Sequence, residues 1–249
     1  MSRKFPFDTI GKAIGAVAGL ALGASLSACN AENISFGGKQ GVPLSELDMT
    51  GEAPESIALA GPDTVRLSEG QELLIEVEGS QAMKDAMRFH LEGKTLAIMR
   101  SKDAPDGERA TVLVTMPAPK SLVIAGSGTV HAEKLAEKAD VTIAGAGSAE
   151  TKGIAVNALD VNIVGSGSYR ASGTAGSLDL NIAGSGDADL DELMVEKADI
   201  SIAGSGRGAF RSDGKVDASI MGSGTVKVKG RAKCEVSSMG SGKLICEEA

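Results

Sequence analysis

The chain has 249 residues, of which 42% are hydrophobic and 23% charged, and its formal net charge is −8. This composition is ordinary for a soluble globular or repeat protein and contains too few apolar runs for a protein with several membrane spans. An acidic chain without a Lys/Arg patch is a poor candidate for binding nucleic acid, so we expect no nucleic-acid partner. Glycine is abundant at 33 residues, whereas Trp is absent and Tyr occurs once. This abundance of small residues favours thin stacked layers over a bulky aromatic core.

Residues 1–28 have the features of a secretory signal peptide. A basic start is followed by an apolar stretch over residues 13–24, which is too short to span a membrane comfortably, and then by small residues. The letters LSAC at residues 26–29 resemble a bacterial lipobox, in which cleavage before Cys29 frees that residue for lipid attachment. Cleavage near Ser27 by the ordinary signal peptidase, which would release a soluble protein, is the alternative. We predict an outer-membrane lipoprotein of the cell envelope, facing the periplasm or the surface and held in the membrane through Cys29.

Two regions of different texture follow the lipobox. Residues 29–53 are polar and contain Gly and Pro without an apolar period, which is typical of a flexible spacer. Over residues 54–120, apolar and polar residues alternate in short runs, as they do in half-buried strands. The segment Ser80–Met87 predicts a short helix with Ser80 as its N-cap. We expect residues 54–120 to form a β-rich N-terminal part of the fold.

A repeat dominates residues 121–249. Seven apolar segments, each ending in a Gly-Ser-Gly or Gly-Ala-Gly triplet, recur at steps of 18 to 20 residues. A unit of this length is too small to bury its own apolar face and must be covered by its neighbours. Alternation within each segment places two columns of residues on one side of the strand. The columns are Leu122, Val141, Val161, Leu180, Ile200, Ala218 and Val236, and Ile124, Ile143, Ile163, Ile182, Ile202, Ile220 and Ser238.

These columns predict an all-β fold, a single-stranded parallel β-helix whose successive coils lie about 4.8 Å apart. Both columns then point inward. The triplets become corners, where the backbone must turn within three residues and the corner of the next coil must pack against it. A Cβ atom would hinder both, which explains the glycines. The predicted corner glycines are Gly126, Gly128, Gly145, Gly147, Gly165, Gly167, Gly184, Gly186, Gly204, Gly206, Gly222, Gly224, Gly240 and Gly242.

Binding functions for these corners find little support in the sequence. The triplets lack the Lys-Ser/Thr of a P-loop and the spacing of a dinucleotide-binding loop. The segment Gly184–Asp191 comes nearest to a calcium-binding nonapeptide repeat, but its period is wrong and its acids fall on either side of the required position. We therefore expect no cofactor and no metal site.

One acidic residue per coil precedes the inward strand. Stacked carboxylates repel one another at coil spacing, and a lysine two residues earlier, on the same face, can compensate in four of six coils. A solvated, mixed-charge face that discourages lateral aggregation is one interpretation. A weak cation-binding or cell-surface-binding stripe is the other. The stripe comprises Asp140, Asp160, Asp179, Asp199 and Asp217, followed by Glu235.

Signals for catalysis are weak. His90 and His131 are the two histidines, and neither lies near a nucleophile motif. No coil exceeds 20 residues, so the inserts that wall the active-site grooves of β-helix lyases and hydrolases are absent from the sequence. We expect no catalytic residues and a non-enzymatic, envelope-anchored protein that presents a rigid repetitive surface, for adhesion or for contact with envelope polysaccharide or a surface protein. A glycan-active lyase or hydrolase on the same fold is the alternative.

Two cysteines remain once Cys29 is assigned to lipid attachment. Aligning the last repeat with the one before it places Cys234 and Cys246 inside the last coil, on opposite sides of its corner. Outside the cytoplasm such a pair can form a disulfide, which here would close the stack. Two buried free thiols, acting as small apolar residues, are the alternative.

Together these segments carry a family resemblance. A lead-in with LLIEVEGSQAMKDAMRFHLEGKTLAI, then VTMPAPKSLVIAGSGTV, then the tandem triplet coils, resembles the bacterial family called putative auto-transporter adhesin, head GIN domain. The resemblance covers residues 54–246, and the ladder of strands and Gly-Ser-Gly corners is its most specific part. It implies a right-handed parallel β-helix on a secreted or lipid-anchored protein of the bacterial envelope, and it brings no catalytic residues.

Overall fold

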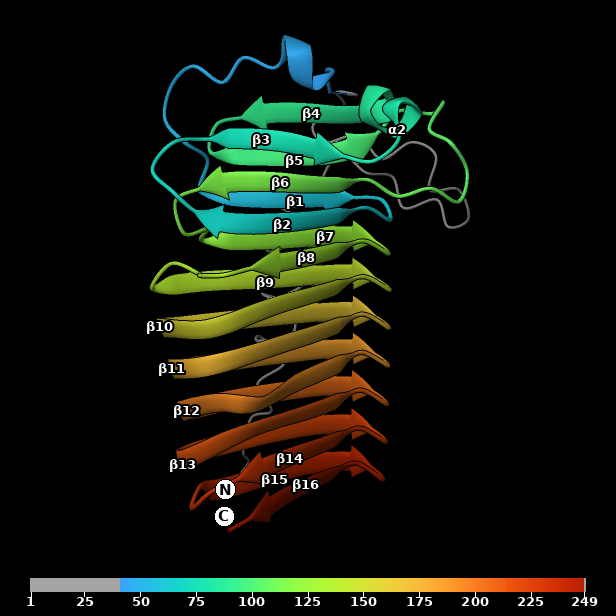
Figure 1. The fold of residues 1–249 in the computed structure, drawn as a ribbon. Coiled ribbons are helices and arrows are strands. Elements are labelled where there is room, and N and C mark those ends of the chain that lie inside the picture. The colour runs from blue at the N-terminus through green and yellow to red at the C-terminus, as the bar shows by residue number, and fades with distance from the viewer. Residues whose placement is uncertain (1–40, 249) are drawn as a thin grey trace.

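The computed structural model describes residues 41–248, so the predicted signal peptide and Cys29 lie outside the described residues. The described part forms a parallel β-solenoid of about seven turns (Figure 1), which confirms the predicted β-helix. Sixteen strands join in one continuous sheet that wraps around a central core. The sheet has two long faces, and in the repeated coils successive strand segments belong to the two faces in turn.

Each face is a ladder of mostly parallel strands. The first face comprises β4 (Met87–Glu92), β5 (Thr95–Arg100), β1 (Ser56–Ala60), β7 (Ser121–Gly126), β9 (Lys138–Gly145), the C-terminal halves of β10 to β13, and β15 (Lys233–Gly240). The second face comprises β3 (Leu74–Glu78), β6 (Thr111–Met116), β2 (Thr64–Glu69), β8 (Thr129–Ala132), the N-terminal halves of β10 (Ser148–Gly165), β11 (Ser168–Gly184), β12 (Asp187–Gly204) and β13 (Arg207–Gly222), then β14 (Thr225–Lys229) and β16 (Lys243–Glu247). Strands β10 to β13 belong to both faces because each bends midway, where its register with the next strand shifts.

The N-terminal end of the solenoid is closed by antiparallel pairing. Strand β4 pairs with β5, and β3 pairs with β6, in both cases antiparallel. Helix α2 (Gln81–Ala86) lies at this end, and the Ser80 hydroxyl caps it by accepting a hydrogen bond from the Met83 amide at 3.2 Å. The outermost strands at this end, β3 and β4, therefore run antiparallel to their neighbours.

Part of the segment expected to be a spacer, over residues 42–47, contacts the solenoid. Val42 forms a bridge with Phe89 of β4, and the 3-10 turn η2 (Leu44–Glu46) follows it. Leu44 and Leu47 are partly buried against the core, since both are apolar and lie over its N-terminal end. The ordered fold therefore begins before residue 54.

The predicted inward columns form part of the core. From Leu122 to Ala218, and from Ile124 to Ile220, every member of the two columns is at most 4% exposed. Val236, in the last coil, is 53% exposed because no further coil covers it within the described residues. The predicted register of the repeat is therefore correct.

The two glycines of each corner are needed for different physical reasons. The first glycine of every triplet has φ between +113° and +128°, a region that other residues rarely adopt. A Cβ on Gly184 would also lie 2.4 Å from the carbonyl oxygen of Gly165 in the preceding coil. A Cβ on the second glycine, Gly186, would instead lie 2.4 Å from Cγ2 of Ile163 in the core. The first glycine thus permits the turn, and the second permits the packing beneath it.

A further corner lies at Gly61, where the triplet is absent from the sequence. Gly61 has φ of +125°, and β1 pairs in register with β7, so this corner stacks on that of Gly126. Asp63 is fully buried, and its carboxylate accepts hydrogen bonds from Arg100 Nε at 2.5 Å and from the Ala110 amide at 2.7 Å. The ion pair with Arg100 therefore fixes this corner to the strand above it.

We expect the corner to tolerate alanine poorly. Gly184→Ala should cost at least about 2 kcal/mol of unfolding free energy, because the new Cβ meets both an unfavourable φ and a backbone oxygen. Gly153→Ala is the matched control, since Gly153 has φ of +63° but open space around the new atom, and it should cost about 1 kcal/mol. Urea unfolding of both variants measures the difference, and equal midpoints would contradict a packed corner.

The inward register gives a second prediction. Ile182→Asp places an unpaired carboxylate in the core and should cost several kcal/mol, whereas Ala183→Asp on the exposed outer side should cost under about 1 kcal/mol. Thermal unfolding compares the two variants. Similar melting temperatures would mean that the assigned register is wrong.

Candidate functional site

A groove of about 580 Å³ runs along the second face, over β8, β10, β11, β12, β13 and β14. Its walls are outward-pointing side chains that stack in two columns, one residue per coil. The corner column, next to the triplets, consists of Thr129, Ser148, Ser168, Asp187, Arg207 and Thr225. The charge column consists of His131, Glu150, Arg170, Asp189, Ala209 and Lys227.

The charge column alternates in sign along the groove. His131 Nδ1 lies 2.9 Å from Glu150 Oε2, and Arg170 Nε lies 3.0 Å from Asp189 Oδ2. Lys152 Nζ also lies 3.0 Å from Glu150, and hydrogen bonds from Lys152 and then from His131 hold the pKa of the Glu150 carboxyl below its usual range. Opposite charges at coil spacing attract, so the groove presents both signs without internal repulsion.

The alternation stops at Ala209. This small side chain lies between Asp189 and Lys227 in the column, with Arg207 two residues before it on the same strand. Ala209 therefore leaves space between an acid and a base. A polar ligand seated there could contact both groups at once.

Three carboxylates on the outward side of β12 border the groove. They belong to the Gly184–Asp191 segment and are Asp187, Asp189 and Asp191. Asp189 is paired with Arg170, and Asp191 Oδ1 lies 3.1 Å from Lys229 Nζ. Among residues 41–248, no group of three or more His, Cys, Asp or Glu side chains is arranged to hold a metal ion.

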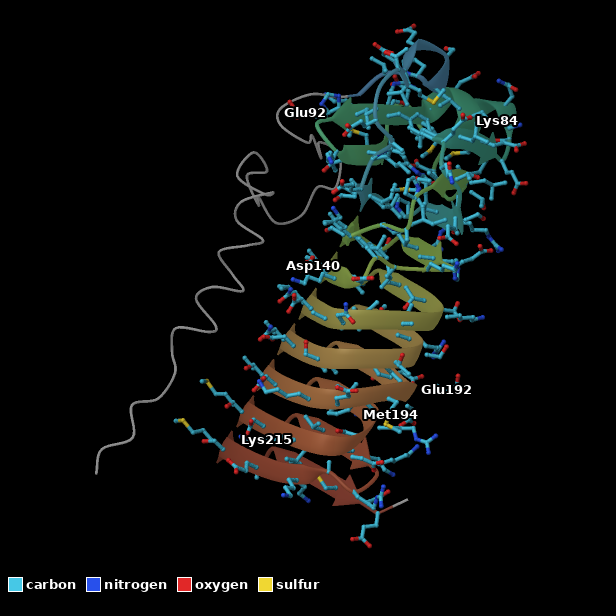
Figure 2. The ribbon with its side chains drawn as sticks, turned by 90° about the vertical axis from the view of Figure 1, so that its left-hand side faces the viewer. Lys84, Glu92, Asp140, Glu192, Met194 and Lys215 are labelled. Atoms are coloured by element: carbon cyan, nitrogen blue, oxygen red, sulfur yellow. A yellow bond between two sulfur atoms is a disulfide. The ribbon has the colours of Figure 1, made fainter. Side chains whose placement is uncertain are left out.

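The acidic stripe lies on the first face, away from the groove. Its members stand opposite one another in register from Asp140 to Asp217. Figure 2 shows Asp140 and Lys215 on one side of the stack, and Glu192 and Met194 on the other. The stripe occupies the C-terminal halves of β10 to β12 and the groove their N-terminal halves, so the two are separate surfaces.

The stripe divides into two parts along the solenoid. Burial raises the pKa of Asp140, Asp160 and Asp179. Further down the stack, Asp199 and Asp217 each lie 2.9 Å from a lysine two residues earlier, Lys197 and Lys215 respectively. In these two coils a lysine thus compensates the charge of the stacked carboxylate, as the sequence predicts. Binding of a cation or of a cell surface by the stripe stays a prediction.

The remaining candidate residues lie at the two ends of the solenoid or outside the described residues. His90 belongs to β4 at the N-terminal end, far from His131 in the groove. A disulfide joins Cys234 in β15 to Cys246 in β16, with 6.8 Å between their Cα atoms. No helix in the part of the chain that the structure describes is long and apolar enough to cross a membrane.

Sequence analysis did not find the groove, although a signal was present. Members of the corner column follow the second glycine of each triplet by one residue, and members of the charge column follow it by three. Because the strand after the corner has the same alternation as the strand before it, an alignment on the triplets would have revealed both columns.

Crystal structures of three bacterial proteins share this fold. A putative adhesin from Bacteroides fragilis NCTC 9343 is 18% identical, with a TM-score of 0.68 over 80% of this chain and 93% of that one. A putative lipid binding protein from Parabacteroides distasonis ATCC 8503 is 22% identical, with a TM-score of 0.63 over 80% and 93% of the two chains. A putative adhesin from Parabacteroides merdae ATCC 43184 is 18% identical, with a TM-score of 0.59 over 80% and 92%. At these identities the likeness extends to the fold alone.

The sequence itself gives the family. No curated protein sequence matches the chain. The family model described as "Putative auto-transporter adhesin, head GIN domain" matches residues 53–232, which is most of the described solenoid. The chain therefore belongs to the putative auto-transporter adhesin, head GIN domain family.

Proposed function

We propose that this protein is a non-catalytic component of the bacterial cell envelope that binds an extended polymer in the groove of its second face. The polymer is an envelope polysaccharide or a segment of a surface protein, and the role is adhesion. The family description supports an adhesive role, and so do two structural neighbours that are described as putative adhesins. Anchoring by a lipid on Cys29 is part of the proposal, and it rests on the sequence of the lipobox.

The shape and chemistry of the groove carry this proposal. The groove follows the solenoid axis across several coils, which suits a chain more than a compact small molecule. Hydroxyl, carboxylate, guanidinium and ammonium groups line it, and these are the groups that hydrogen-bond sugar hydroxyls and carboxylates. Because each side chain projects from a paired strand, the backbone of the groove needs no ordering on binding.

The same groups argue against catalysis. A general acid needs a pKa near the working pH, yet the pKa of Glu150 is lowered by its basic neighbours. Asp189 and Asp191 form ion pairs with Arg170 and Lys229, respectively. The carboxyl groups whose pKa burial raises lie on the first face, outside the groove. The glycan-active enzyme remains the competing function, because the groove does combine acids with a histidine.

Filling the groove should abolish binding while leaving the fold intact. Ala209→Trp places a bulky ring between Asp189 and Lys227 without entering the core, and we expect at least about a ten-fold loss of affinity. Envelope polysaccharide extracted from the producing bacterium and immobilised on a sensor surface serves as the probe. Binding of the full-length protein is measured by interferometry.

Ala203→Trp is the matched control, since Ala203 is also small and exposed but points outward from the first face. This variant should bind as the parent does. Equal losses in both variants, or none in either, would remove the groove from the proposed function.

We further expect no turnover of polysaccharides. The protein is incubated with a panel of acidic and neutral polymers, and reducing ends and unsaturated products are measured over time. Product formation that disappears in Glu150→Gln or His131→Ala would establish the enzyme and overturn the proposal.

A further inference from the structure

The C-terminal end of the solenoid is open, unlike the N-terminal end. Strand β15 pairs only with β13, and β16 pairs only with β14. Within residues 41–248 the outer edges of both strands therefore present unpaired backbone N–H and C=O groups. Such an edge is a template for pairing with another strand.

The apolar interior is uncovered at the same end. Val236 is 53% exposed, although Ala218 directly above it is 4% exposed. Cys246 on β16, which stands in register with the buried Val228, is exposed as well. Terminal repeats of solenoids need a polar cap to stay apart, and this coil leaves apolar residues in that position.

The disulfide keeps this open edge in place. Cys234 and Cys246 join β15 to β16 across the last corner. A terminal coil without such a bond would fray, because it has a neighbour on one side only. The bond thus preserves two parallel-sheet edges in the conformation that a partner strand requires.

We infer that a second copy of this chain covers the open end, so that two solenoids pair end to end about a two-fold axis. Such an axis makes the strands that meet antiparallel. With the axis at Ile245, β16 of one copy meets β16 of the other, and Lys243 faces the second copy's Glu247 at both ends of the pair. The same axis passes Val236, so the exposed Val236 of one copy meets Val236 of the other.

This register agrees with the alternation of side chains. Lys243, Ile245 and Glu247 point outward from β16, whereas Leu244 and Cys246 point inward, as the pairing with β14 shows. An antiparallel pairing centred on Ile245 places inward residues opposite inward residues. The cores of the two copies then join, and the contact closes at two molecules because a two-fold axis uses the same surface of both copies.

The pairing is tested by reversing charges at its two ends. The full-length protein is purified from the expressing cells in mild detergent. Its mass by light scattering should be that of a dimer. Lys243→Glu puts like charges together twice per dimer and should weaken dimerisation by about ten-fold or more. The double variant Lys243→Glu with Glu247→Lys restores both pairs and should restore the dimer.

Lys84→Glu is the control, because it makes the same charge change on the exposed surface of α2 at the opposite end. It should leave the dimer intact. A parent protein that is monomeric at all concentrations, or that forms longer filaments, would overturn the inference. Dimerisation that Lys243→Glu leaves unchanged, or that the double variant fails to restore, would also overturn it. These outcomes do not depend on the ligand of the groove.

Discussion

The close approach of successive corners is the constraint on which the rest of the structure depends. The amide of each middle residue donates to the carbonyl of the first glycine one coil before, as Ser185 does to Gly165 at 2.8 Å. The backbone ladder therefore continues through the bend instead of stopping there. It can do so only where no Cβ occupies the space between the coils. Gly184 shows this, because its φ is positive and a Cβ on it would lie 2.4 Å from the carbonyl oxygen of Gly165.

A continuous ladder fixes every later position relative to the corner. Residues one and three positions after the second glycine must point outward on the second face, whatever their chemistry. The outer positions are then free to vary, and the charges of the groove alternate there while the inward columns stay apolar. Among the buried aromatic rings, that of Tyr169 fits inside because its neighbours in the column are small. Tyr169 lies between Ala149 and Ala188, and its hydroxyl is 2.8 Å from Thr151 Oγ1.

The repeated part of the fold could be predicted because the same physical demand recurs seven times in the sequence. The lead-in could not, since its order in space differs from its order in the chain: β1 lies between β5 and β7. At Gly61 a buried Asp63 replaces the second glycine and is held by Arg100, a contact between residues distant in sequence. The groove did not follow from the inward columns, because those columns belong to the strand before each corner. The groove's charges lie on the strand after it.

The two ends of the solenoid differ in a way that bears on adhesion. Residue 42 pairs with β4 at the closed end, so the chain that would carry the proposed lipid on Cys29 enters the solenoid at that end. End-to-end pairing through β15 and β16 would then place the two anchors at opposite ends of a doubled solenoid. Molecules in one membrane would have to lie flat to pair in this way, whereas molecules in facing membranes could meet tip to tip. The polarity of the stack thus favours contact between surfaces, with a groove from each copy exposed along the shared axis.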